Sequence, residues 1–210
     1  MDQLLTIFLD LIASLKNLDK ELFIFVHAKA SSPALDWFFK AMRNALTWIP
    51  LYAFVLYWII RKNKSNTLAF ILLTLLTFAI TDHTSAAIMK PYFQRLRPCF
   101  DPSLDQYVRE LISCGGKYGM PSTHASNHFG LASFWFFAIR WMNNRSWYWL
   151  WIWAFVIGYA QVYVGKHYPG DILVGALLGT FVGLILALLF RAWRLKSRST
   201  TINSQSETIH

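Results

Sequence analysis

The sequence predicts an all-α integral membrane protein: a bundle of five to six transmembrane helices, with N-terminal helices lying at the membrane interface. The first observation is composition, since 55% of the 210 residues are hydrophobic and only 15% are charged, whereas soluble domains carry about 25% charged residues. The second is the order of the chain, in which apolar stretches alternate with short polar stretches rich in Lys and Arg. An extended backbone cannot cross lipid unpaired, so these stretches are expected to be helices.

Five apolar segments follow one another between residues 45 and 190. Two of them, residues 147–165 and 172–190, contain no charged residue and have the length of about 20 residues that a helix needs to cross the hydrocarbon. The other three require polar residues in or beside the membrane, which we expect to face the protein interior. They are residues 45–60, 68–89 and 125–139.

The first 44 residues lack a comparable segment. Residues 4–15 have an amphipathic pattern, and the apolar run 22–28 is too short to span. We therefore predict one or two interfacial helices here, with a sixth, imperfect span as the alternative. The chain is thus divided into an interfacial region, a transmembrane core and a polar cytoplasmic tail that is disordered from residue 197 on: residues 1–44, 45–193 and 194–210.

Two features within the spans are interpreted as structural. Gly175, Gly179 and Gly183 recur every four residues in the last segment, a pattern that allows close helix packing. Asp82 lies in the second segment, where a carboxylate is costly in lipid, so we expect it to face inward toward the cations that end the same segment.

The net charge of +9 comes largely from Lys and Arg between the apolar segments, which favours a membrane surface over a nucleic-acid partner. One side of the predicted membrane carries Arg61, Lys62, Lys64, Arg140, Arg145, Arg191, Arg194, Lys196 and Arg198. The other side carries cations partly balanced by acids. The positive-inside rule therefore predicts that the first side, and the C-terminus, lie in the cytoplasm.

Cys99 and Cys114 are the two cysteines, and both lie in the loop between the second and third segments. On the predicted topology this loop is outside the cytoplasm, where a disulfide is expected. Closing a loop of that size contributes about 3 kcal/mol in the entropy model. The alternative is two free thiols.

Three polar clusters occur at the ends of apolar segments. KPYFQRLRP (residues 90–98) ends one segment, PSTH (121–124) begins the next, and HYPGD (167–171) links the following two. A chain that crosses back and forth must bring these points to one membrane face. That face then gathers residues suited to holding a phosphate and attacking it, namely Lys90, Arg97, His124, His167 and Asp171.

Each cluster also has a simpler interpretation. Lys90 and Arg97 can anchor a helix end at the headgroups, and Ser122 can simply cap a helix. Asp171 is favourable in any first helical turn, and His167 can be an ordinary loop residue. Yet a helix N-terminus is also an anion site, and the occurrence of all three clusters on one face favours a functional site.

The pattern K-x6-RP, PS-x-H, H-x3-D resembles the type-2 phosphatidic acid phosphatases, lipid phosphate phosphatases related to vanadium haloperoxidases. The resemblance covers residues 90–171. The first motif corresponds to Lys90, Arg97 and Pro98, and the second to Pro121, Ser122, Thr123 and His124, with Thr123 where many members have glycine. The third motif usually begins with Ser-Arg, and Gln161 stands here in place of that arginine.

The resemblance implies covalent catalysis without a metal or other cofactor, at the membrane surface. His167 attacks phosphorus, Asp171 orients it, and His124 protonates the leaving oxygen and then activates water. The phosphate oxygens are bound by Lys90, Arg97, Ser122, Thr123 and Gln161. The substrate implied is a lipid phosphate, and the sequence leaves open undecaprenyl diphosphate, phosphatidylglycerol phosphate, phosphatidate and a lipid A phosphate. A cell-envelope carrier lipid is slightly favoured by the small outer loop. No obligatory protein partner is evident.

Gln161 leaves two alternatives open, because it can donate hydrogen bonds but brings no charge. Either another cation compensates, for which Arg95, Lys117 and Lys166 are the candidates, or the chain is a lipid-phosphate binder or transporter that has lost activity. A third alternative is a metal-dependent hydrolase, since His124 and His128 are four residues apart on one helix face. We instead expect His128 to hydrogen-bond Asn127 or Asp82.

Overall fold

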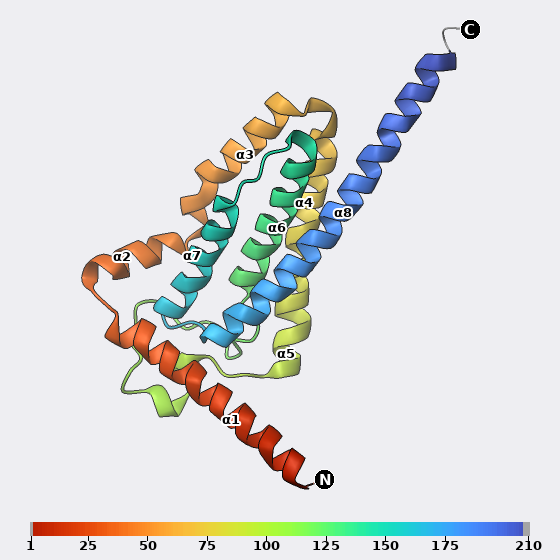
Figure 1. Ribbon diagram of the computed structural model, residues 1–210. Helices are drawn as coiled ribbons and strands as arrows, with labels where there is room; N and C mark the ends of the chain where they lie inside the picture. The colour runs from red at the N-terminus through yellow and green to blue at the C-terminus, as the bar shows by residue number, and fades with distance from the viewer. Residues whose placement is uncertain (1, 208–210) are drawn as a thin grey trace.

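A computed structural model describes residues 2–207, with side chains described for residues 3–196. Over these residues the chain is helical throughout its regular structure, with a single isolated β-bridge between Leu96 and Tyr118. This confirms the predicted all-α class. The longer helices are α1 Asp2–Ile24, α2 Pro33–Met42, α3 Ile49–Lys62, α4 Thr67–His83, α6 Thr123–Asn143, α7 Trp149–Tyr163 and α8 Pro169–Glu207. Helices α3, α4, α6, α7 and α8 form a bundle, from which α1 projects (Figure 1).

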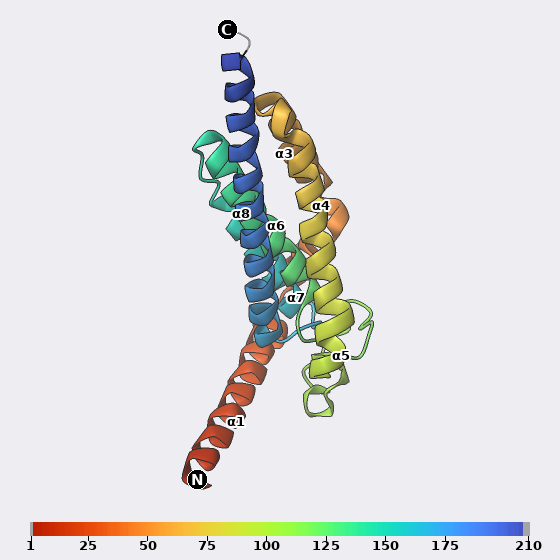
Figure 2. The same cartoon turned by 90° about the vertical axis from the view of Figure 1, so that its right-hand side faces the viewer.

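Helix α6 lies at the centre of the bundle, between α4, α7 and α8 (Figures 1 and 2). It is buried along most of its length, and its aromatic side chains form the core with those of its neighbours. Phe134 packs between Phe70 of α4 and Phe190 of α8, and Trp135 stacks on Trp153 of α7 at a centroid distance of 5.7 Å. The central helix α6 carries His124 in its own first turn and packs against α7 and α8, whose connection carries His167, so it positions the site described below.

Small residues bring α6 and α8 into direct backbone contact. A Cβ added at Gly179 would collide with the carbonyl oxygen of Ser126, and one at Gly183 with that of Gly130. A Cβ at Gly175 would lie 2.6 Å from the carbonyl oxygen of Ser122. The expectation that these three glycines allow close packing is therefore confirmed.

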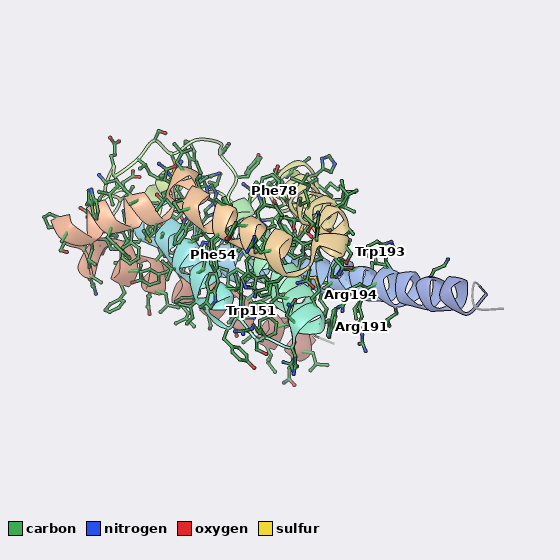
Figure 3. The ribbon with its side chains drawn as sticks, turned by 90° about the horizontal axis from the view of Figure 1, so that it is seen from above. Phe54, Phe78, Trp151, Arg191, Trp193 and Arg194 are labelled. Carbon is green, nitrogen blue, oxygen red and sulfur yellow. A yellow bond between two sulfur atoms is a disulfide. The ribbon has the colours of Figure 1, made fainter. Side chains whose placement is uncertain are left out.

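Two continuous helical stretches, Lys64–Phe93 and Pro169–Lys196, are long and apolar enough to cross a membrane by themselves, and α7 is apolar but shorter. Lys64–Phe93 joins α4 through a π-helical segment, Thr84–Met89, to the short helix α5, Lys90–Phe93. Large apolar side chains such as Phe54 and Phe78 are exposed on the outside of the bundle (Figure 3). An outward apolar surface of this kind fits a lipid environment.

The N-terminal region forms two helices, α1 and α2, which agrees with the expectation of one or two helices here. Their position at the membrane interface stays a prediction. Helix α1 continues as a π-helical segment, Phe25–Lys29, and leaves the bundle at its lower end in Figure 1. Most of its apolar side chains are exposed, including Leu4 and Phe8, while Phe23 and His27 at its far end are buried. The helix is thus attached to the bundle by its C-terminal end alone.

The prediction of a disordered tail was wrong for residues 197–207, because α8 continues as a helix to Glu207. Extending an existing helix adds one hydrogen bond for each residue and avoids the cost of a new nucleus. Residues 208–210 lie outside the described residues.

The three motifs come together at one end of the bundle. Helix α5, the start of α6 and the turn between α7 and α8 all lie at the lower end in Figure 1. The basic clusters after α3 and α6 and on α8 lie at the other end, where Arg191 stacks on the Trp141 ring at 5.2 Å and Arg194 donates to the Trp141 carbonyl oxygen at 2.6 Å. The two groups of residues that were assigned to opposite sides of the membrane therefore lie at opposite ends of the bundle.

Candidate active site

The motifs meet at a single cavity of about 810 Å³. Its polar end is lined by residues of all three motifs, namely Lys90, Arg97, Thr123, His124, Gln161 and His167. The two remaining predicted residues, Ser122 and Asp171, are fully buried behind this lining. Successive helices run in opposite directions, so the end of one and the start of the next meet here. Residues that are distant in sequence therefore line the same wall.

His167 follows α7 and is 2% exposed. Its Nδ1 lies 3.4 Å from Oδ2 of Asp171, which also accepts a 3.0 Å hydrogen bond from the backbone N–H of Tyr168. Nε2 is therefore the ring nitrogen available to a bound group. Burial lowers the pKa of His167 to about 4, against the opposing effect of Asp171 and with help from Arg97 and Lys90. A neutral imidazole at neutral pH is the form that can act as a nucleophile.

Arg95 lies on the other side of Asp171. Its Nη1 donates a 3.0 Å hydrogen bond to Asp171 Oδ1, and its Nη2 donates a 2.6 Å hydrogen bond to Asp19 Oδ2 of α1. The guanidinium also lies 4.2 Å above the Tyr168 ring. Arg95 is absent from the described cavity lining, and two carboxylates hold it behind that lining, which disfavours it as the replacement for the missing arginine.

Arg97 reaches the cavity from the loop that contains the disulfide. Its Nε donates to the Tyr118 carbonyl oxygen at 3.2 Å and its Nη1 to the Cys114 carbonyl oxygen at 3.3 Å. Lys166 Nζ donates to the same carbonyl oxygen. The predicted disulfide between Cys99 and Cys114 is present, so the bridge that closes this loop also fixes the acceptor of two cavity cations.

The start of α6 has the geometry of a helix end that can bind an anion. Ser122 is its N-cap, and the Ser122 hydroxyl accepts a 3.4 Å hydrogen bond from the Ala125 N–H. The Ser122 N–H itself donates to the Asp171 backbone oxygen at 3.0 Å, which ties the second motif to the third. Thr123 and His124, in the first turn, face the cavity, where the helix dipole favours negative charge.

The expected partner of His128 was wrong. His128 Nδ1 lies 2.8 Å from the His124 carbonyl oxygen, one turn back, and Nε2 lies 3.4 Å from the Tyr52 hydroxyl. Asn127 instead donates to Asp82 at 3.0 Å, so Asp82 does face inward. The buried ring of His128 satisfies itself on its own helix because the i−4 carbonyl is the nearest acceptor.

A metal site would need more ligands than the two histidines. Among the described residues there is no group of three or more His, Cys, Asp and Glu side chains placed to hold a metal ion. His128 has both ring nitrogens close to other partners. Within the described residues, His124 and His128 therefore do not make up a metal site by themselves.

Gln161 occupies the place of the missing arginine in the cavity wall. It is 1% exposed, and its Nε2 has no hydrogen-bond partner among the described residues. A buried donor without a partner is costly. Gln161 lines the same cavity as His167, so an oxyanion bound there could be the acceptor for this donor.

Of the other two candidate cations, Lys117 is exposed and absent from the described lining, whereas Lys166 lines the cavity. Burial lowers the pKa of Lys166 to about 8, with further lowering by Arg97, Arg43 and Lys90. Arg43 also lines the cavity. It was not among the sequence candidates, because one arginine before an apolar segment carries no motif and is typical of a headgroup anchor.

The cavity continues from its polar end into the bundle between α3, α4 and α6. There the lining is apolar and includes Val55, Leu56, Phe70, Ile71, Leu75, Phe78 and Leu131. A ligand that fills the whole cavity must therefore combine an anionic group with a hydrocarbon part.

Comparison with known proteins agrees with this geometry. Residues 66–195 match the model of the PAP2 superfamily. The chain is 32% identical over 196 residues to a lipid A 4'-phosphatase of Bacteroides thetaiotaomicron, covering 90% of this chain and 83% of that protein. It is 31% identical over 170 residues to a lipid A 4'-phosphatase of Porphyromonas gingivalis, covering 80% and 70%. The crystal structure of Aquifex aeolicus LpxE is similar with a TM-score of 0.58 at 26% identity, over 80% of this chain and 94% of that one.

Proposed function

Since the chain belongs to the PAP2 superfamily, we propose that it removes a phosphate group from a lipid A-type glycolipid, at the periplasmic face of a bacterial inner membrane, through a phosphohistidine. Membership confirms the family expected from the motifs, and with it a membrane phosphatase. The substrate, the membrane face and the chemical steps are the proposal.

The single observation that carries the proposal is the cavity, which joins the histidines and cations of the motifs to an apolar channel between α3, α4 and α6. A phosphate ester of a lipid has this division of charge and hydrocarbon. With its phosphate against His167, its chain lies between helices that face the membrane. Burial of that chain supplies binding free energy at about 25 cal/mol per Å² of apolar surface.

In the first step, the Nε2 lone pair of His167 forms a bond to phosphorus as the bond from phosphorus to the lipid oxygen breaks. His124 gives its proton to that departing oxygen. Asp171, 3.4 Å from Nδ1, stabilises the positive charge that develops on the ring. Lys90, Arg97, Gln161 and the first turn of α6 hold the non-bridging oxygens.

In the second step, His124 takes a proton from water as the water oxygen attacks phosphorus. The bond between phosphorus and Nε2 then breaks, its electron pair returns to His167, and inorganic phosphate leaves. His124 again carries the proton it needs, so the site is restored. No residue on this path requires a metal, which makes activity independent of chelators the expected result.

Two features support a periplasmic site, and one lies at each end of the bundle. The site end carries the disulfide between Cys99 and Cys114, and disulfides persist outside the cytoplasm. The other end carries the basic clusters that follow α3 and α6, and such clusters remain in the cytoplasm.

A lipid A phosphate is favoured among the four lipids that the sequence left open. Two relatives above 30% identity, aligned over most of this chain, are lipid A 4'-phosphatases. The motifs themselves contain nothing that selects a carrier lipid over a glycolipid, and the slight preference for a carrier lipid rested on the small outer loop and the bacterial character of the sequence.

The test is phosphate release by the purified full-length protein from lipid A, undecaprenyl diphosphate, phosphatidylglycerol phosphate and phosphatidate, with and without EDTA. The proposal expects fastest turnover of lipid A and no effect of EDTA. Faster turnover of another lipid would correct the substrate, and loss of activity in EDTA would favour the metal-dependent alternative. Binding of all four without turnover would favour a lipid-phosphate binder or transporter.

A further inference from the structure

We infer that Arg43 is a phosphate-binding residue of this site and supplies the positive charge that Gln161 lacks, an inference that rests on the proposed phosphatase function. Phosphoryl transfer spreads negative charge over the oxygens on phosphorus, and cations aimed at them are a main source of catalysis. The usual arginine of the third motif is absent here. The structure brings another arginine to the same cavity.

The backbone around Arg43 is held by caps on both sides. Arg43 is the C-cap of α2, with its N–H bonded to the Phe39 carbonyl oxygen at 3.2 Å. The next residue, Asn44, caps the following turn by accepting a 3.1 Å hydrogen bond from the Leu46 N–H. A position between two capped helical segments has little freedom, so the direction of its side chain into the cavity is built into the fold.

Helix α2 is docked on the end of α7 that carries Gln161. The Phe39 and Tyr163 rings lie 4.5 Å apart, and the Tyr163 hydroxyl donates a 2.8 Å hydrogen bond to Asp36. Asp36 also accepts a 3.0 Å hydrogen bond from Arg109 Nη1. These contacts hold the first and middle turns of α2 against Tyr163, two residues after Gln161, and Arg43 follows Phe39 by one helical turn.

Arg43 and Gln161 share an unusual feature. Arg43 Nε and Gln161 Nε2 are both buried, and neither has a hydrogen-bond partner among the described residues. Arg43 also has no ion pair within that part of the chain. Buried unpaired donors are rare in native proteins and call for an explanation. One oxyanion in the cavity that both residues line would satisfy both.

The positive charges around the cavity also support an anion site. Burial lowers the pKa of the Arg43 guanidinium, although an arginine stays protonated. Arg43 in turn lowers the pKa values of Arg97 and Lys166, after the larger effect of burial on each. Cations that repel one another around a shared cavity are stabilised by an anion between them.

Of the other candidates for this role, Lys117 lies outside the described lining, and the remaining two are already engaged. Arg95 is held by Asp19 and Asp171, and Lys166 donates to the Cys114 carbonyl oxygen. An arginine also offers a planar, two-pronged set of donors that matches a phosphate, as a lysine does not. Arg43 therefore provides the chemistry of the lost arginine, from a segment that precedes the matched residues 66–195.

The experiment compares Arg43→Gln, Arg43→Lys and the matched control Lys40→Ala, an exposed cation on the same helix, as full-length purified proteins. Removing one such group is expected to lower kcat for the best lipid substrate by about 10²–10³-fold. KM should change much less, Arg43→Lys should retain part of the rate, and Lys40→Ala should match the wild type. Undiminished kcat in Arg43→Gln would overturn the inference.

Rescue distinguishes a phosphate-binding role from a structural one. Gln161→Arg restores the arginine of the third motif, so adding it to Arg43→Gln should recover at least about ten-fold of the lost rate. A merely structural defect would stay uncorrected, and that result would also overturn the inference.

Binding of orthovanadate, an oxyanion with the shape and charge of phosphate, separates this inference from the proposed function. Orthovanadate should raise the Tm of the wild type and of Lys40→Ala more than that of Arg43→Gln. If no lipid in the panel is hydrolysed, the proposed function fails, yet this difference would still support Arg43 as an anion ligand. Equal Tm shifts in all three proteins would refute it.

Discussion

Arg95 holds Asp171 on the side that faces away from His167. Arg95 Nη1 donates to Asp171 Oδ1 at 3.0 Å, while Asp171 Oδ2 lies 3.4 Å from His167 Nδ1. The same guanidinium donates to Asp19 of α1 at 2.6 Å. The carboxylate that orients the proposed nucleophile is therefore connected to the N-terminal helix through one side chain.

The first prediction concerns Asp19, a positioning residue. Asp19→Asn removes the charge that holds Arg95, so Arg95 shifts toward Asp171 and competes with His167 for its carboxylate. We expect kcat to fall about 10–100-fold, the size of effect that a small displacement of a reacting group produces, with KM nearly unchanged. Asp10→Asn, an exposed position on the same helix, is the control. Equal kinetics in the two variants would contradict the proposed coupling.

The second prediction concerns the two histidines. His167→Ala should lower phosphate release about 10⁴-fold or more, because the nucleophile is lost. His124→Ala should be severely impaired with lipid substrates but less so with a phosphate ester whose leaving group needs no proton. Acid-quenched reactions with radiolabelled substrate should show phosphorylated protein in the wild type and none in His167→Ala. Normal turnover by His167→Ala would end the phosphohistidine proposal.

The third prediction concerns pH. Only neutral His167 can attack, so activity should be present above its pKa and lost as the pH falls through it. Burial lowers that pKa to about 4, below the value of about 6.5 for a free histidine. The acid limb of kcat/KM, corrected for the titration of the substrate phosphate near about pH 6, should therefore have its midpoint well below 6.5. A midpoint at 6.5 or above would contradict the described environment.

The fourth prediction concerns the disulfide. Replacing both Cys99 and Cys114 by Ser should lower the free energy of unfolding by about 3 kcal/mol, measured as a lower Tm in detergent. The Cys114 carbonyl oxygen also accepts from Arg97 and Lys166, so a loosened loop should weaken protection by orthovanadate as well. An exposed Ser113→Ala variant in the same loop controls for local changes. Loss of stability without loss of vanadate protection would separate the two roles.

The fifth prediction concerns topology. In intact cells, a membrane-impermeant maleimide should leave both cysteines unlabelled until a reductant is added, and then label them from outside. The site lies at the same end of the bundle as this loop, so the result assigns the site to one face. Labelling that needs a permeabilised inner membrane would place the site in the cytoplasm.

The sequence was sufficient to predict which helix ends meet. His124 and His167 sit at opposite ends of apolar segments that run in opposite directions, so a chain that crosses the bundle repeatedly must bring them together. The glycines of α8 were predictable for a similar reason, since a four-residue period places them on one helix face. Both inferences depend only on the spacing of residues along the chain, which is the same however the helices pack.

The contacts that depend on tertiary packing were not predictable. Arg43 and Asp19 reach the site region from helices whose docking depends on side-chain contacts, such as that between Phe39 and Tyr163. No regular pattern in the sequence indicates how these helices dock. Arg95 looked like a free cation because its two acidic partners are distant in the chain. His128 hydrogen-bonds a backbone carbonyl oxygen on its own helix, and not Asn127 or Asp82, the polar side chains that were expected as its partners.

Helix α1 also sets a condition on biosynthesis. Asp19 accepts hydrogen bonds from Arg95, 76 residues further along the chain, and from the N–H of Gly170, 151 residues further along. The ribosome therefore releases α1 long before its partners exist, and its apolar side chains must wait on the lipid surface. Asp171 reaches its final surroundings only when α8 has begun to form, so the proposed site is complete only after most of the bundle has been synthesised.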